Sequence, residues 1–436
     1  MHTCRSLHGK SGAGRIKNGI WRIGLHPRTI ETDHEEISYQ MKTTRLFKEI
    51  NIQTSCIGYL KAKIILAFVL LMLILSCGRQ KFHEIKVDNP QFIPDTAFIG
   101  FEDLSSPKFE ALKQKYQMDT IFHGEADELK RILLLRDWIN KHIKIDNDGP
   151  YFGDGSVESI LDEASKGHGF HCGHFTAVQN AIMNAYGYVT RCLLADIGVP
   201  VDLIEGGGHH AINETWLNTY HKWFLSDAKY NCHFEKNGIP LSALDIRAEY
   251  LKNKAVDITL MKGPNRTPTE FYQELKDSSK RELESRSKEL YARIYTWISW
   301  GKYNNRYTNW PKTKTDYMNV YEDDYFKNHV WLWDGKPLWA YNTEYMNRVK
   351  ERQPIEWTPN TITSKVTIEG SKAKIELHSI TPNLKTYQMK EMPDGDWKDV
   401  SNALEMELKK DKNEIVFREI TLAGVTGTEH KIIIER

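Results

Sequence analysis

Residues 169–193 read GFHCGHFTAVQNAIMNAYGYVTRCL, and this stretch decides the predicted fold. Its apolar residues recur at helical spacing from Cys172 onward, and Gly187 is a suitable helix stop. The inward-facing stripe of the predicted helix comprises Phe175, Val178, Ile182 and Ala185. A strand over 188–196 is predicted to follow, so the helix leads directly into a sheet.

A second stretch, residues 206–231, reads GGGHHAINETWLNTYHKWFLSDAKYN. It predicts strands over 210–217 and 221–227, joined by a tight polar turn. Upstream, apolar residues at helical spacing predict a further helix over 126–143. Helices that precede a strand and a hairpin indicate an α+β fold for this part of the chain.

The register of the predicted hairpin brings two functional side chains together. If the turn is centred between residues 219 and 220, Ile212 faces Asp227 across the hairpin. His210 and Asp227 are then diagonal neighbours on one face, where a carboxylate can reach an imidazole nitrogen. Alternation along the strand turns His209, the competing base, to the opposite face.

Cys172 is the candidate nucleophile. A cysteine reacts as the thiolate, and the unpaired N–H groups at a helix start favour a negative sulfur. A carboxylate on one nitrogen of His210 leaves the other nitrogen to take the thiol proton, as in a catalytic triad. Taken alone, Cys172 is more simply an ordinary buried residue. Its expected partners, His210 and Asp227, are what favour catalysis.

Together with LLLRDWINKHIKI at 133–145, the two stretches resemble the core of the transglutaminase-like superfamily, which has a papain-like cysteine fold. The resemblance implies that Cys172, His210 and Asp227 are the catalytic triad and that the substrate is a carboxamide or peptide bond. Ile212 stands where the family often has Trp, and Asp227 lacks the usual following proline. The calcium-binding regions and the β-sandwich front domain of the animal enzymes are not recognisable in this sequence.

The expected activity is thiol-dependent acyl transfer on a peptide, protein or glycopeptide, and the resemblance favours hydrolysis over transfer to an amine. No cofactor and no metal are expected. Two alternatives stay open. One is a catalytically inactive surface protein that binds peptide or glycan. The other is a metal site, which only the His168-x-x-His171 spacing favours. Its candidate ligands are His168, His171, Cys172, His174, His209 and His210.

The N-terminal part predicts export. Residues 64–75 read IILAFVLLMLIL, a run that is too short to span a bilayer and suits the core of a signal peptide. The following Ser76-Cys77 resembles the end of a bacterial lipoprotein signal, which would make Cys77 the lipid anchor. An uncleaved anchor helix is the alternative. Either interpretation places the remainder outside the cytoplasm, attached to a membrane, in the periplasm or at the cell surface.

Five regions are predicted along the chain. Residues 1–77 are a leader of uncertain start, 78–125 a tether and packing segment, 126–255 the catalytic core, 256–358 a helical aromatic-rich region and 359–436 an all-β sandwich. The third of these is the transglutaminase-like core, and the last resembles an immunoglobulin or fibronectin domain.

The aromatic-rich region is predicted to begin with a long helix. Thr267-Pro268-Thr269-Glu270 is typical of a helix start, and the helix is expected to run to about Trp300. Packing is the favoured role of the aromatic residues, ahead of a groove for glycan or peptide. The tryptophans concerned are Trp297, Trp300, Trp310, Trp331, Trp333, Trp339 and Trp357.

Charge and cysteine content narrow the possible partners and the redox state. Lys and Arg total 59 against 58 Asp and Glu, so the net charge of +1 provides no field to hold a nucleic acid. Beyond Cys77 the chain has three cysteines, an odd number in an oxidising compartment. Cys192 and Cys232 form the only intramolecular pair that leaves Cys172 free.

Overall fold

The computed structural model describes residues 84–88, 91–95, 97–200, 208–277, 279–309, 318–330, 332–333, 336–337, 346–409 and 411–435. All the described residues belong to one compact unit, which spans residues 79–436. The predicted signal segment and its anchor Cys77 lie outside the described residues. Within the described ranges, none of the helices combines the length and apolar character needed to cross a bilayer.

A six-stranded sheet forms the centre of the catalytic region, in the order β21-β17-β15-β5-β7-β8. Neighbouring strands run antiparallel, except for the parallel pair β17 and β21. The strands are β5 (Thr190–Asp196), β7 (His209–Leu217), β8 (Lys222–Ser226), β15 (Trp297–Gly301), β17 (Met318–Tyr321) and β21 (Met346–Val349). The predicted strand and hairpin therefore exist, and three strands from later in the chain complete the sheet.

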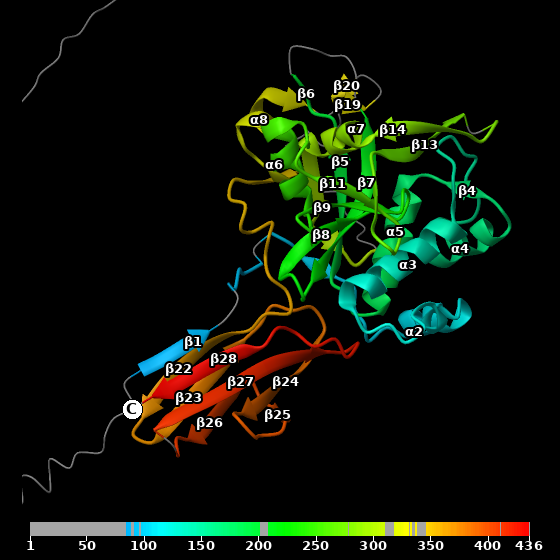
Figure 1. Ribbon diagram of the computed structural model, residues 1–436. Helices are drawn as coiled ribbons and strands as arrows, with labels where there is room; N and C mark the ends of the chain where they lie inside the picture. Colours follow the sequence, from blue (N-terminus) through cyan, green and yellow to red (C-terminus); the bar gives the residue numbers. More distant parts are fainter. Residues whose placement is uncertain are drawn as a thin grey trace, which may run out of the picture. The chain divides into compact units, whose positions relative to one another are not determined.

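Helices cover the two faces of this sheet, with a hydrophobic core on each side. The first core contains α2 (Pro107–Lys115), α3 (Glu128–His142), α4 (Val157–Ser165) and α5 (Cys172–Ala185), and the second contains α6 (Ala243–Asn253) and α7 (Lys288–Arg293). Figure 1 shows α3, α4 and α5 grouped beside β7. Alternation explains how one strand serves both cores: on β8, Phe224 lies in the first core and Leu225 in the second.

Short elements link these parts. They are β2 (Gly100–Phe101), η1 (Met118–Ile121), β3 (Lys144–Ile145), β4 (Gly169–Phe170), β6 (Val199–Pro200), η2 (Ile294–Thr296), β16 (Tyr303–Asn304), α8 (Asp324–Asn328), β18 (His329–Val330), β19 (Leu332–Trp333) and β20 (Lys336–Pro337). A second sheet has the order β10-β9-β11-β12, with β9 (Cys232–Lys236), β10 (Ile239–Pro240), β11 (Thr259–Lys262) and β12 (Thr267–Thr269).

The predicted long helix from Thr267 to Trp300 is wrong. Its place is taken by β12 and by a hairpin of β13 (Phe271–Asp277) and β14 (Glu282–Ser287), and the described helices of the 256–358 region are short. The Asp277 carboxylate accepts hydrogen bonds from the backbone N–H groups of Ser279 and Lys280, at 3.0 and 3.2 Å. Such a side-chain turn competes with helical hydrogen bonds and reverses the chain.

The tryptophans of this region whose side chains are described are buried, in keeping with the packing role favoured from the sequence. Trp297, Trp300 and Trp357 are at most 1% exposed. Trp310, Trp331 and Trp339 lie outside the described residues.

The C-terminal region contains two sheets that share one hydrophobic core. One has the order β22-β23-β26 and the other the order β1-β28-β27-β24-β25. The strands are β1 (Glu84–Asp88), β22 (Thr363–Glu369), β23 (Lys372–His378), β24 (Leu384–Glu391), β25 (Lys398–Val400), β26 (Ala403–Glu407), β27 (Lys412–Thr421) and β28 (His430–Glu435). In Figure 1 the blue β1 lies along the red β28, a pairing that the sequence did not predict. The immunoglobulin-like or fibronectin-like assignment stays a prediction.

Candidate active site

Cys172 is the first residue of α5, as the sequence predicted. His171 caps the helix, and its ring Nδ1 accepts a hydrogen bond from the Gly173 N–H at 3.0 Å. Within the first turn, the Thr176 hydroxyl donates to the Cys172 carbonyl at 2.9 Å. The thiol therefore lies at the positive end of the helix dipole, on a residue that is 9% exposed.

The hairpin of β7 and β8 has the predicted register. Asn213 pairs with Ser226, which places Ile212 opposite Asp227. His210 Nε2 and Asp227 Oδ2 are 2.7 Å apart, and both side chains are 2% exposed. His209 is exposed, as alternation predicts. Because Nε2 of His210 bonds to the carboxylate, Nδ1 is the nitrogen left to exchange a proton with a thiol.

The pKa values of Cys172 and His210 shift in opposite directions. Burial raises the pKa of the Cys172 thiol, but hydrogen bonds with His171 and His210 and the charges of His210 and Lys229 hold it well below its ordinary value. Burial lowers the pKa of His210, but the charge and hydrogen bond of Asp227, together with Cys172, raise it to about 9. Both shifts favour a thiolate paired with an imidazolium over the neutral pair.

Two tyrosines complete the surroundings of Asp227, and sequence reasoning missed both. The Tyr291 hydroxyl, from α7, donates to Asp227 Oδ2, and the Tyr230 backbone N–H donates to Oδ1 at 3.1 Å. The Tyr230 ring stacks on His210 with 5.0 Å between ring centroids and 27° between planes. The carboxylate is thus held by donors additional to His210. Tyr230 adjoins the quoted hairpin, but no local pattern pointed to Tyr291.

Lys229 is a buried cation close to the same site. The residue is 4% exposed, and its Nζ lies 3.2 Å from Glu274 Oε1, 3.1 Å from Tyr230 Oη and 3.0 Å from Asn147 Oδ1. The Tyr230 hydroxyl also donates to Glu274. Strand β13 therefore contributes a carboxylate that fixes both the cation and the ring stacked on His210.

The pair of Cys192 and Cys232, allowed by cysteine count, does not form: both thiols are free and buried. Cys232 packs in the second core, while Cys192 lines a cavity together with residues of α5 on the other face of the sheet. Burial raises the pKa of Cys192 to about 11 and also raises the pKa of Cys232. Cys192 and Cys232 do not form a disulfide because they lie on opposite faces of the central sheet.

The suggested metal cluster does not assemble. In the part of the chain that the structure describes, no three His, Cys, Asp or Glu side chains converge as a metal site requires. His168 Nδ1 lies 2.7 Å from Glu163 Oε2, and its ring stacks on Phe152 at 3.9 Å between centroids. Burial lowers the pKa of His174 to about 4.

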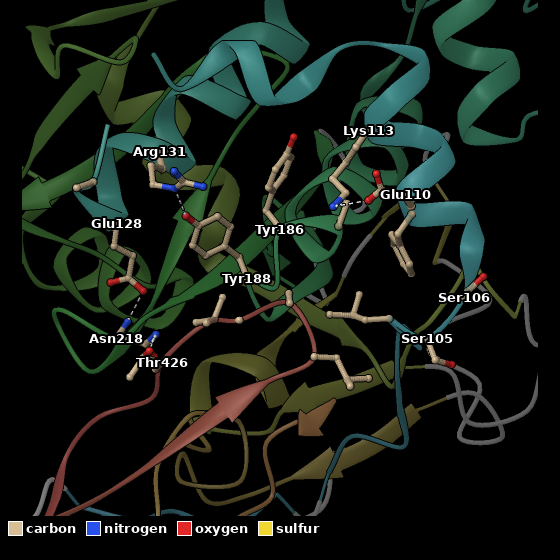
Figure 2. A pocket seen from close by; sticks show the side chains of 18 of the residues that line it. Ser105, Ser106, Glu110, Lys113, Glu128, Arg131, Tyr186, Tyr188, Asn218 and Thr426 are labelled. Atoms are coloured by element: carbon tan, nitrogen blue, oxygen red, sulfur yellow. Dashed lines mark hydrogen bonds and ion pairs between the residues drawn. The ribbon is translucent and has the colours of Figure 1, made fainter. Parts of the chain in front are cut away.

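Two cavities touch α5, at its opposite ends. One, of about 710 Å³, is lined by the end of α5 and by residues 422–426. Figure 2 shows that its charged side chains have partners: Arg131 donates to the Tyr188 hydroxyl, and Lys113 pairs with Glu110. The other, of about 530 Å³, includes Gly173 and Ala211, the chain neighbours of Cys172 and His210. Neither Cys172 nor His210 is itself among the residues that line the second cavity.

Comparison with solved structures gives two distant likenesses. A candidate cysteine protease from Cytophaga hutchinsonii is 17% identical, with a TM-score of 0.22, over 44% of this chain and 54% of that one. Red sea bream transglutaminase is 11% identical, with a TM-score of 0.25, over 81% of this chain and 62% of that one. In both cases the match spans less than two thirds of the solved chain. No curated protein matches the sequence.

One family model matches the sequence. It is described as the transglutaminase-like superfamily and covers residues 116–228, the segment that contains Cys172, His210 and Asp227. Residues 116–228 are thus a domain of the transglutaminase-like superfamily.

Proposed function

We propose that this protein is a thiol-dependent acyl-transfer enzyme that acts on peptide or carboxamide bonds through Cys172, His210 and Asp227. The observation that carries the proposal is the 2.7 Å contact between His210 Nε2 and Asp227 Oδ2, beside a thiol at a helix start. Nucleophile, base and orienting carboxylate are the three groups that covalent acyl transfer needs.

In the proposed reaction the Cys172 thiolate attacks the carbonyl carbon, and the Cys172 backbone N–H stabilises the oxyanion. Protonated His210 gives its proton to the leaving amine, and an acyl-enzyme forms. Water then attacks the acyl-enzyme, His210 takes the proton of that water, and the thiolate is released. We favour water as the acceptor because hydrolysis is the outcome that a resemblance to exported bacterial proteins with this core implies; an amine acceptor would make the same site a transglutaminase.

Thiol alkylation tests the ion pair. At neutral pH, iodoacetamide should label Cys172 at least ten times faster than Cys192 or Cys232, because an ordinary thiol is only a few per cent ionised there. His210→Ala should remove that advantage. Peptide mapping by mass spectrometry assigns the label. Labelling of Cys172 that is slow at neutral pH and rises only near pH 8.5 would contradict the proposal.

Product analysis separates hydrolysis from transfer. A library of glutamine-bearing peptides would be incubated with the protein, with and without an added primary amine. We expect cleaved chains or released ammonia, and no peptide that carries the amine. Amine incorporation as the main product would assign the site to transglutamination instead.

We further propose that the protein is exported and anchored to a membrane through Cys77, where its substrates are peptides, proteins or glycopeptides. The sequence of residues 64–77 supports this proposal. Cys77→Ala should move the protein from the membrane fraction to the soluble fraction. An unchanged distribution would favour an uncleaved anchor helix.

A further inference from the structure

His171 directly precedes the candidate nucleophile, and its ring covers the start of α5. The ring Nδ1 accepts a hydrogen bond from the Gly173 N–H at 3.0 Å, and a Cβ atom at Gly173 would lie 2.9 Å from the Cε1 of that ring. The rings of Tyr151 and His174 pack against it, at 4.8 and 4.1 Å between centroids. His171 is half-buried and Cys172 is 9% exposed, so neither residue is sealed from solvent.

The hydrogen bond to Gly173 decides which ring nitrogen of His171 carries a proton. Because Nδ1 accepts the N–H, its lone pair is occupied and the proton of the neutral ring lies on Nε2. Nε2 is therefore an N–H donor. The same ring forms a hydrogen bond with the Cys172 thiol, which helps to lower the pKa of that thiol. The His171 donor thus lies beside the sulfur from which the reaction starts.

Attack on a carbonyl group moves negative charge away from that sulfur. A bond forms between Sγ of Cys172 and the carbonyl carbon, and the π electron pair of the carbonyl moves onto its oxygen. Preorganised donors aimed at this oxygen stabilise the transition state. The Cys172 backbone N–H is one such donor, because the first N–H groups of a helix have no acceptor within it. A second donor has to lie close to both the sulfur and the start of α5.

Two other donors near the thiol are already engaged. The Lys229 ammonium has three protons, and its Nζ bonds to three oxygen atoms: Asn147 Oδ1, Tyr230 Oη and Glu274 Oε1. The Tyr151 hydroxyl donates to the Asn147 carbonyl at 2.7 Å. Neither side chain can donate to a substrate oxygen without giving up a bond that it has.

The two neighbouring histidines of β7 differ from His171 in role or in place. His210 donates through Nε2 to Asp227, and its Nδ1 exchanges a proton with the thiol and the leaving group. His209 is exposed and lies on the face of β7 opposite to His210. His171 is therefore the imidazole that holds an N–H at the thiol without another task in the reaction.

We propose that the Nε2–H of His171 is the second donor of the oxyanion hole, beside the Cys172 backbone N–H. The inference rests on the proposed function, because it is attack on a carbonyl that places negative charge on oxygen. Before the attack this N–H donates to the thiolate, and during the attack it follows the charge to the oxygen. The hydrogen bond from Gly173 holds the ring in place before substrate arrives.

Two substitutions separate the proposed donor from the helix cap. Asn places its side-chain oxygen where Nδ1 lies, so His171→Asn keeps an acceptor for the Gly173 N–H and removes the distal donor. Gln places its amide nitrogen near the position of Nε2, so His171→Gln keeps the donor and loses the cap. His171→Asn should lose catalysis and keep its melting temperature, whereas His171→Gln should do the reverse. A role in capping alone predicts that His171→Gln is the more impaired variant in both measurements.

Two small reagents distinguish stabilisation of the oxyanion from stabilisation of the thiolate. p-Nitrophenyl acetate acylates the thiolate through a tetrahedral oxyanion, and p-nitrophenolate leaves as the thioester forms. Iodoacetamide alkylates the same thiolate by displacing iodide, without an oxyanion. Each rate is measured with the full chain at the plateau of its pH profile, from the nitrophenolate burst and from intact mass, and Cys172→Ala gives the background. The ratio of the two rates then reports on the oxyanion alone.

In His171→Asn the ratio of acylation to alkylation should fall about 10²-fold, as expected for the loss of one oxyanion donor. His171→Gln should keep most of the wild-type ratio. His209→Asn, the matched change at an exposed histidine, should leave the ratio unchanged. An unchanged ratio in His171→Asn, or an equal fall in His171→Gln or His209→Asn, overturns the proposal. If His171→Asn does not fold, the ratio in His171→Gln decides between the donor and the cap.

The wild-type protein separates a failure of this inference from a failure of the proposed function. Slow labelling of Cys172 by iodoacetamide, or the lack of a nitrophenolate burst, would refute the proposed function. If the wild-type protein and His171→Asn both react quickly with both reagents, the proposed function stands and only the role of His171 is refuted.

Discussion

The pKa values of two buried thiols, Cys172 and Cys232, are shifted in opposite directions, and the charge of Asp227 contributes to both shifts. Cys172 is 9% exposed and Cys232 1%. Asp227 exchanges two backbone hydrogen bonds with Cys232, each 3.1 Å long, and its negative charge, after burial, raises the pKa of that thiol. At Cys172 the charge of Asp227 acts through His210, which presents a positive charge instead. The Asp227 carboxylate therefore raises the pKa of Cys232, which it contacts directly. Through the positive charge that it favours on His210, it lowers the pKa of Cys172.

The largest expected effect is a difference in turnover between variants of Cys172 and of Cys232. Cys172→Ala should lower turnover by at least about 10³-fold, because loss of the nucleophile removes the covalent route. Cys232→Ala, the matched change, should leave turnover within a few fold while it lowers thermal stability through a small core cavity. Steady-state rates and melting temperatures measure both. If a folded Cys232→Ala variant lost its activity, the prediction that Cys232 is not needed for turnover would be contradicted.

Asp227→Asn should change the two thiols in opposite directions. His210 loses its anionic partner, so its pKa should fall from about 9 toward its ordinary value, and the pKa of Cys172 should rise. The pKa of Cys232 should fall, because a negative neighbour is gone. Turnover should drop on the order of 10³-fold. Wild-type activity should decline above about pH 9, as His210 loses its proton, and in the variant this alkaline limit should move to lower pH. An unmoved limit would contradict the role of Asp227.

Tyr291→Phe should have an intermediate effect. The change removes the hydroxyl that donates to Asp227 and leaves the ring, so we expect about a tenfold lower kcat with little change in KM. Tyr272→Phe is the control: its ring packs 4.8 Å from that of Tyr291, between centroids. Equal effects of the two changes would indicate packing alone.

The smallest effect should come from Lys229 and Glu274. Lys229→Met removes a cation that lowers the pKa of Cys172, so labelling at neutral pH should slow by a few fold. Glu274→Gln leaves the cation less neutralised and should lower that pKa slightly. The pH dependence of iodoacetamide labelling measures both. If the pKa of Cys172 shifted in the same direction in both variants, Lys229 and Glu274 would act on the site through geometry and not through charge.

Features formed by residues that lie close together in the chain could be predicted from the sequence. The start of α5 at Cys172 was predicted because apolar periodicity is local, and the register at Asp227 because a short turn leaves one pairing that buries the hairpin correctly. α5 is 14 residues long, and the hairpin partners Asn213 and Ser226 are only 13 residues apart.

Long-range features could not be inferred in this way. The contact of Tyr291 with Asp227 spans 64 residues and depends on where α7 packs. The helix predicted from Thr267 failed because the Asp277 turn satisfies backbone donors that a helix would have used.

The pairing of β1 with β28 has a consequence for biosynthesis. β1 spans Glu84–Asp88 and pairs with residues 431–435. A ribosome makes β1 long before its partner residues, which begin at Lys431, 343 residues after Asp88. Throughout that interval the hydrogen-bonding edge of β1 is open to water or to other chains, and such edges promote aggregation. Delayed closure therefore leaves this edge of β1 unpaired for longer than the edge of a hairpin strand, whose partner follows within a few residues.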